Sequence, residues 1–115
     1  MGGSLRGTVG GANFAAMDLD AILATLRAHE AELRAMGVRS LSVFGSQARR
    51  EAGRDSDVDL AATLDATRPI GLSGMAVLEE RLATLLKRDV DLVGEPVEMK
   101  PRLQALIERD RAVAF

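Results

Sequence analysis

The chain has 115 residues, is 47% hydrophobic but only 3% aromatic, and contains no cysteine. This length suffices for one small domain with a single core, and the lack of cysteine excludes disulfides and thiolate metal sites. A net charge of −2 argues against direct binding of nucleic acid, and no apolar run approaches the ~18 residues that a membrane span needs.

The first part of the chain divides into a leader and a helix. Residues 1–17 are rich in glycine and have no periodic pattern, so we expect a disordered leader or tag, and we place the folded domain at residues 18–115. Asp18 is suited to cap a helix that runs to about Met36, with leucines and an isoleucine on one face. His29 has no partner at metal-ligand spacing and is interpreted as a boundary residue of that helix.

A strand and a turn follow. Residues Val38–Phe44 are rich in β-branched and apolar residues and predict a strand that stops at Gly45. Ser46 then opens a short helical stretch to Glu51. A strand that turns into a helix N-terminus directs backbone N–H groups outward, where phosphate oxygens are favoured. Gly45 would let a ligand approach the backbone, Ser46 would add a hydroxyl and Arg49 a positive charge. Alternatively, Ser46 is only a helix cap.

The next segment carries a pair of acids. Asp57 and Asp59 flank a valine in a predicted strand over residues 57–64, so their side chains project from the same face, about 6.6 Å apart along the backbone. Two like charges directed together are unfavourable unless a cation lies between them, and Mg²⁺ prefers carboxylate and phosphate oxygens. Ser56 is expected to help place Asp57. A solvated strand edge is the alternative interpretation of this pair.

A third acid comes from a later strand. Residues 65–71, which contain a proline, predict a loop over the rim of the site, and residues 72–87 predict a core helix from leucines spaced three and four apart. The strand Val90–Val93 then contains one carboxylate, Asp91. An acid among buried neighbours needs a partner or an ion, which makes Asp91 a candidate ligand. The alternative is an exposed acid on an edge strand.

The end of the chain predicts one more helix. Pro101 suits the first turn of a helix that ends near Asp110, with Leu103, Leu106 and Ile107 facing inward. The apolar residues 112–115 suggest either a short edge strand or a docking patch.

The acidic strands and the preceding turn together resemble a known family. The ordered combination is Gly45-Ser46-x-Ala48-Arg49, then Ser56-Asp57-x-Asp59-Leu60, then the lone Asp91. It closely resembles the minimal nucleotidyltransferases of the polymerase-β-like superfamily, from about Leu19 to the C-terminus. The resemblance implies an α+β fold, the polymerase-β-like nucleotidyltransferase core, in which helices flank a small mixed β-sheet and the aspartates gather at one end.

The resemblance also implies the reaction and its residues. A nucleoside monophosphate would pass from an NTP, with ATP expected, to a hydroxyl group, with the help of Mg²⁺ ions, of which two are expected. The acids Asp57, Asp59 and Asp91 would be catalytic and hold the metal. Nucleotide binding would fall to Gly45, Ser46, Arg49 and Ser56.

Stand-alone minimal members resemble antitoxins that are encoded beside a HEPN-domain toxin. In that group AMP is transferred from ATP to a tyrosine of the toxin, which blocks its RNase activity, and the two proteins are expected to form a hetero-oligomer. Two alternatives stay open: an antitoxin that acts by binding alone, and a small-molecule nucleotidyltransferase whose acceptor site lies on another chain. In each case we expect a cytoplasmic protein.

Overall fold

The computed structural model describes residues 18–51, 57–97 and 100–115. The predictions of a disordered leader over residues 1–17 and of a role for Ser56 lie outside these residues.

A four-stranded mixed sheet forms the centre of the fold. Its strands are β1 (Val38–Phe44), β2 (Val58–Leu64), β3 (Val90–Glu95) and the two-residue β4 (Ala112–Val113), and their order in the sheet is β3-β2-β1-β4. Strand β1 is antiparallel to both β2 and β4, whereas β2 and β3 are parallel. The small mixed sheet of an α+β domain is therefore confirmed.

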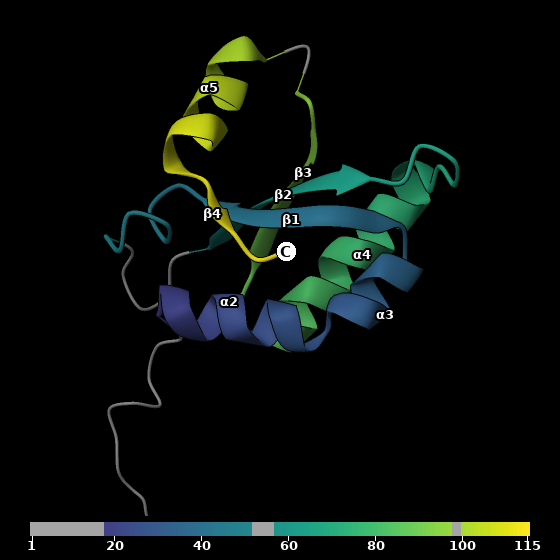
Figure 1. The fold of residues 1–115 in the computed structure, drawn as a ribbon, viewed down its shortest axis with the longest axis horizontal. Coiled ribbons are helices and arrows are strands. Elements are labelled where there is room, and N and C mark those ends of the chain that lie inside the picture. Colours follow the sequence, from purple (N-terminus) through teal and green to yellow (C-terminus); the bar gives the residue numbers. More distant parts are fainter. Residues whose placement is uncertain (1–17, 52–56, 98–99) are drawn as a thin grey trace, which may run out of the picture.

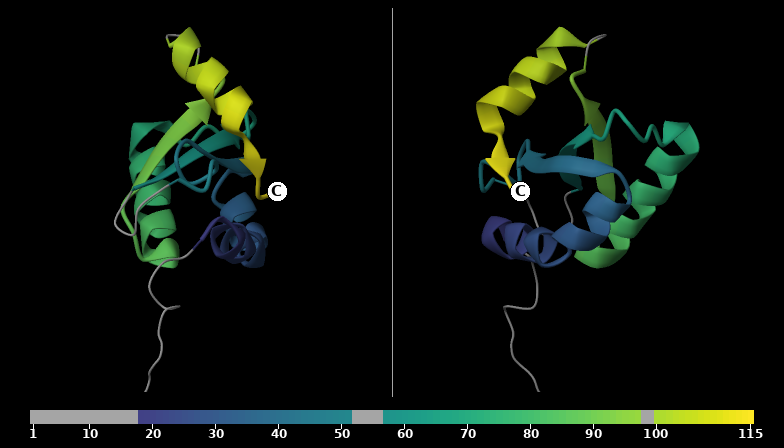
Figure 2. Two further views of the ribbon diagram at one scale, coloured as in Figure 1. Left: turned by 90° about the vertical axis from the view of Figure 1, so that its left-hand side faces the viewer. Right: turned by 45° about the vertical axis from the view of Figure 1, so that its right-hand side comes forward.

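Helices cover the two faces of this sheet unequally. The helices α2 (Leu19–Ala28), α3 (Glu30–Ala35) and α4 (Gly71–Leu86) lie on one face, and α5 (Pro101–Asp110) lies on the other (Figures 1 and 2). Among the described residues, no helix has the length and apolar character needed to cross a membrane.

The two faces of β2 explain this arrangement. Val58, Leu60 and Ala62 alternate along the strand and pack into the large core under α2, α3 and α4. Ala61 points the other way and packs with Phe44 and Ile107 in a small second cluster beneath α5. Asp59 lies two residues before Ala61 and therefore belongs to the α5 side of the sheet. For brevity, we call the two sides the core face and the α5 face.

The first helix differs from the prediction. Asp18 caps it as expected, because its Oδ1 accepts a hydrogen bond from the backbone N–H of Ala21 at 2.9 Å. The prediction of one helix to Met36 is wrong: the backbone leaves the helical region at His29, with φ −108° and ψ 18°. Leu26 of α2 and Leu33 of α3, on either side of this break, are both fully buried.

The segment after β1 is a turn and does not form the short helix that we expected over residues 46–51. Its first hydrogen bond is helical, from the N–H of Arg49 to the carbonyl of Gly45 at 3.1 Å. The N–H of Glu51 then reaches the carbonyl of Ser46, five residues back, and Arg50 has a φ of +59°. Left-handed backbone is unfavourable for most side chains and ends a helix, so the segment closes on itself after one turn.

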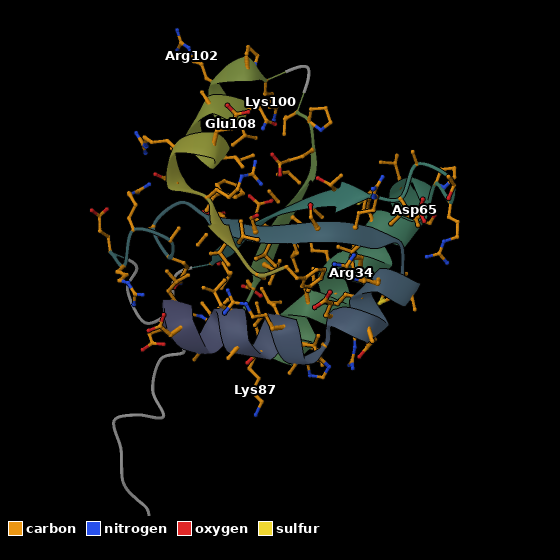
Figure 3. All side chains as sticks on the ribbon, in the orientation of Figure 1. Arg34, Asp65, Lys87, Lys100, Arg102 and Glu108 are labelled. Atoms are coloured by element: carbon orange, nitrogen blue, oxygen red, sulfur yellow. The ribbon has the colours of Figure 1, made fainter. Side chains whose placement is uncertain are left out.

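The loop before α4 lies at the wrong end of β2 to form a rim over the predicted site. The N–H of Asp65 donates to the carbonyl of Gly37 at 2.8 Å, which fixes the loop beside the start of β1. Figure 3 shows Asp65 at the right, beyond the arrowhead of β2. Asp59 is near the start of β2 and the loop follows its end, so the length of the strand puts the loop on the order of 20 Å from that aspartate. The expected rim is therefore wrong, whereas the core helix that follows is confirmed.

The C-terminal elements agree with the sequence. Pro101 occupies the first turn of α5, and Ile107 is fully buried. Of the two interpretations of the apolar end, the edge strand is correct, since Ala112 and Val113 pair with Val43 and Ser42 of β1. The ring of Phe115 lies under the guanidinium of Arg34, 5.0 Å from its centroid.

Candidate active site

Asp59 and Asp91 occupy directly paired positions on neighbouring parallel strands. The register of β2 and β3 places Val58 opposite Val90, Asp59 opposite Asp91 and Leu60 opposite Leu92. Paired residues of adjacent strands project from the same face of a sheet, so both carboxylates lie on the α5 face. The fold therefore brings together two predicted site residues that are 32 positions apart in the sequence.

Asp57 joins them at the same end of the sheet. It immediately precedes β2, two residues before Asp59, and its side chain is exposed. Its negative charge is near enough to act on the pKa of Asp59. The expectation that the three aspartates gather at one end of the sheet is thus supported by strand register and by electrostatics.

Asp59 is the electrostatic focus of this group. Burial is the largest cause that raises the pKa of its carboxyl above the ordinary value, followed by the negative charges of Asp91 and Asp57. Arg49 acts in the opposite direction and lowers this pKa. The carboxylate is thus less stable here than in water, and a cation bound beside it would relieve the repulsion.

The donor set at this position suits a hard cation. In the part of the chain that the structure describes, no three His, Cys, Asp or Glu side chains are arranged to hold one metal ion. A pair of carboxylates without a complete protein cage is nevertheless typical of Mg²⁺, which takes part of its coordination from substrate phosphate and water. The residues therefore fit magnesium, while the metal shell of three aspartates stays a prediction.

Gly45 is required by the close approach of Asp59. Its φ is +75°, and a Cβ atom added at this position would lie only 2.5 Å from Oδ2 of Asp59. The adjacent Phe44 is the register partner of Asp59 across β1 and β2, which explains the proximity. We predicted that this glycine admits a ligand to the backbone. The described structure shows that it admits the Asp59 carboxylate, so the turn and the acidic strand form one unit.

Arg49 lies on the turn that follows Gly45, and two acids bind it. Its Nε donates to Oε1 of Glu51 at 2.9 Å, and its Nη1 donates to Oδ2 of Asp110 at 2.6 Å. Both contacts raise the pKa of its guanidinium, so Arg49 remains positively charged. Its role in nucleotide binding, like those of Gly45 and the half-buried Ser46, stays a prediction.

Asp91 is more exposed than we expected from its apolar neighbours. Strand β3 is at the edge of the sheet, so the Asp91 side chain is open to solvent although Leu92 is buried. The argument from burial was therefore wrong, and the edge-strand alternative describes its exposure correctly. Its position beside Asp59 comes from strand register.

A polar cluster that we did not predict from the sequence connects α5 and the residue after it to strand β3. Arg111 donates to Oε1 and Oε2 of Glu95 at 2.8 and 2.5 Å and to the hydroxyl of Ser42 at 3.2 Å. Gln104 of α5 donates to the same Glu95 at 2.8 Å. Hydrogen bonds from Arg111 hold the pKa of Glu95 below its ordinary value. These residues lie far apart in the chain, and no local pattern links them.

Comparison with known proteins agrees with this geometry. Residues 29–113 match the family described as polymerase beta, nucleotidyltransferase. The protein adenylyltransferase MntA of Thermococcus cleftensis is 45% identical over 80 residues, which cover 69% of this chain and 79% of that protein.

Solved structures show the same fold. A minimal nucleotidyltransferase structure superposes with a TM-score of 0.68 at 35% identity, covering 84% of this chain and 95% of the other. A tri-AMPylated HEPN toxin of Shewanella oneidensis in complex with an MNT antitoxin gives a TM-score of 0.57 at 19% identity, over 81% of this chain and 71% of the matched chain. At that identity the second similarity establishes the fold alone.

Proposed function

Because the chain belongs to the polymerase-β nucleotidyltransferase family, we propose that it transfers AMP from ATP to a protein. The acceptor would be a tyrosine hydroxyl of a HEPN-domain toxin. The transfer would neutralise the RNase activity of that toxin. The similarity to a protein adenylyltransferase supports a protein as the acceptor. The fold shared with the antitoxin of an AMPylated toxin complex is consistent with a toxin as that protein.

The observation that carries the proposal is the pairing of Asp59 with Asp91 beside the Gly45 turn. The register of β2 and β3 sets the two carboxylates side by side, and the turn after β1 lies against Asp59 itself. Paired acids beside a turn that could bind phosphate support nucleotidyl transfer, because charge on the triphosphate and on the leaving pyrophosphate must be balanced.

Magnesium is the cofactor that fits these residues. Asp59 and Asp91 would hold it together with Asp57. Burial and then the charges of Asp91 and Asp57 raise the pKa of Asp59, and such an ion would offset both effects. When bound, Mg²⁺ would neutralise charge on the phosphates and activate the oxygen that attacks.

The chain's own residues would perform three tasks. Backbone N–H groups of the Gly45–Ser46 turn, with the charge of Arg49, would grip the β and γ phosphates of ATP. Asp57 and Asp59 would fix the orientation of the triphosphate through the metal site. Asp91, which is exposed, would accept the proton of the incoming hydroxyl, since a tyrosine with an ordinary pKa of about 10 needs such help.

Co-expression with the toxin candidate encoded next to this chain tests the proposal. We expect the intact mass of the toxin to increase by one or more AMP units with the wild-type chain, and to stay unchanged with the D57N/D59N double variant. The D65N variant is the matched control, because Asp65 lies at the other end of β2. It should support modification at the wild-type level.

The alternatives give different results in the same experiment. An unmodified toxin that is still bound and inhibited by the D57N/D59N variant would favour an antitoxin that acts by binding. A chain that consumes MgATP with a small hydroxylated acceptor but leaves the toxin unmodified would favour a small-molecule transferase.

A further inference from the structure

Asp110 is an unusual residue for the position it occupies. It is the last residue of α5, where the helix dipole is negative and a second negative charge is unfavourable. Its side chain is only 4% exposed, and it accepts hydrogen bonds from Arg49 and from its neighbour Arg109. A carboxylate held in this place against the dipole needs those two cations.

The contact with Arg49 spans two elements that are remote in sequence. Arg49 and Asp110 are 61 residues apart, and their atoms Nη1 and Oδ2 are 2.6 Å apart. The turn follows β1 and the aspartate precedes β4, and these two strands pair through Val43 and Ala112. The ion pair therefore connects the end of α5 to the turn after β1, which lies beside Asp59 and Asp91.

This contact also bears on the site itself. The charge of Arg49 lowers the pKa of Asp59, so its guanidinium is close enough to act on the acidic centre. Arginine has five N–H donors in a fixed plane, and the bonds to Glu51 and Asp110 engage two of its edges. The nearly buried carboxylate of Asp110 restrains the guanidinium more than the exposed Glu51 does, and among the described residues the other donors of Arg49 have no hydrogen-bond partner.

We propose that Asp110 is a positioning residue that holds the Arg49 guanidinium, and with it the Gly45–Arg50 turn, in the arrangement that binds the triphosphate. The inference rests on the proposed function, since it assumes that this turn binds a nucleotide. Preorganised donors bind a ligand more tightly than mobile ones, because less conformational entropy is lost on binding.

The neighbouring arginine provides a matched control. Arg50 is on the same turn and pairs with Asp20 at 3.0 Å, but Arg50 and Asp20 are 57% and 74% exposed. Exposed pairs of this kind fix little, because water screens them and both side chains are free to move. The D20N variant thus removes an exposed salt bridge from the same turn and leaves the nearly buried carboxylate of Asp110 in place.

The test measures nucleotide affinity and transfer for wild type, D110N and D20N. With MgATP, we expect D110N to raise Kd and KM about five- to twentyfold and to leave kcat within about twofold, which corresponds to about 1–2 kcal/mol of binding free energy. D20N should match the wild type. In the R49A background the D110N substitution should have no further effect on Kd, because the residue that it positions is gone.

A second readout does not depend on nucleotide. The Nη1–H resonance of Arg49, whose group donates to Asp110, should exchange slowly in wild type and in D20N, and quickly in D110N at unchanged fold by circular dichroism. A D110N variant with unchanged or tighter MgATP binding, or with an unchanged Arg49 resonance, would overturn the inference. Wild-type protein that neither binds MgATP nor modifies a toxin would overturn the proposed function, and the inference with it.

Discussion

The two faces of the sheet have different roles in this small protein. The core face is covered by three helices and is filled with buried leucine, valine and isoleucine side chains. Among the described residues, the α5 face has a smaller apolar cluster around Phe44, Ala61 and Ile107. There Glu95 and Arg111 fasten α5, and Asp59 and Asp91 repel each other. The large core and the candidate site therefore lie on opposite faces of the same strands.

The largest effect on stability should come from the core face. Leu82 of α4 is fully buried, so L82A should lower the free energy of unfolding by about 2–5 kcal/mol through lost transfer free energy and a residual cavity. Urea denaturation followed by circular dichroism measures this loss. L85A is the control: Leu85 is only partly buried and should cost clearly less. Equal losses of unfolding free energy for L82A and L85A would mean that burial in this core does not determine the cost of removing a side chain.

The next effect tests the contact between the turn and the acidic strand. G45A should cost about 1–3 kcal/mol, because alanine is strained at φ +75° and its Cβ would collide with the Asp59 carboxylate. G71A is the matched control, since Gly71 has a φ of +68° but has no atom within 4 Å of an added Cβ. The difference between the two variants measures the collision alone. If they lose the same stability, the close approach of Asp59 is not rigid.

A smaller loss of stability should follow when the attractive ion pair between Glu95 and Arg111 on the α5 face is removed. E95Q should lower stability by about 1–2 kcal/mol at neutral pH, because the Arg111 guanidinium loses the nearly buried carboxylate that it pairs with. The folded-state pKa of Glu95 lies below 4.5, so this stability is present above pH 4.5 and is lost as the pH falls through the lowered pKa. Unfolding curves of the variant and wild type should therefore converge in acid. A gap that persists at low pH would assign the loss to packing.

The smallest effect has the opposite sign. D59N should raise the stability of the metal-free protein by less than about 1 kcal/mol at neutral pH, since it removes a half-buried charge and its repulsion from Asp91 and Asp57, both of which water partly screens. The folded-state pKa of Asp59 lies above 3.8, so the wild-type penalty is present above that raised pKa and disappears as the pH falls towards 3.8. The gain should vanish over the same range in thermal melts, and MgCl₂ should stabilise wild type but not D59N. A D59N protein that is less stable than wild type at pH 7 would contradict the repulsion.

Elements with a clear local pattern were predicted well. The periodic leucines of α4, the proline at the start of α5 and the aspartate that caps α2 are recognisable because each acts within one turn or one helix face. Burial of one side of a helix determines its periodicity, and that information is present in a short window of sequence.

The failures came from distant contacts. Residues 46–51 have the composition of a helix start, but the turn is shaped by the approach of Asp59 and ends at the left-handed Arg50. Asp91 appeared buried because its neighbours are apolar, and its exposure depends on β3 lying at the edge of the sheet. The roles of Asp110 and Glu95 could not be predicted, because both depend on arginines in other elements.

The sequence by itself determined the family, the candidate acids and the places of the main strands and of helices α4 and α5, because motif spacing and hydrophobic periodicity are local properties of the chain. The tertiary structure alone decided that Asp59 lies opposite Asp91 and that Asp110 holds Arg49. Strand register and helix docking are set by the packing of the whole core, and no short segment contains that information.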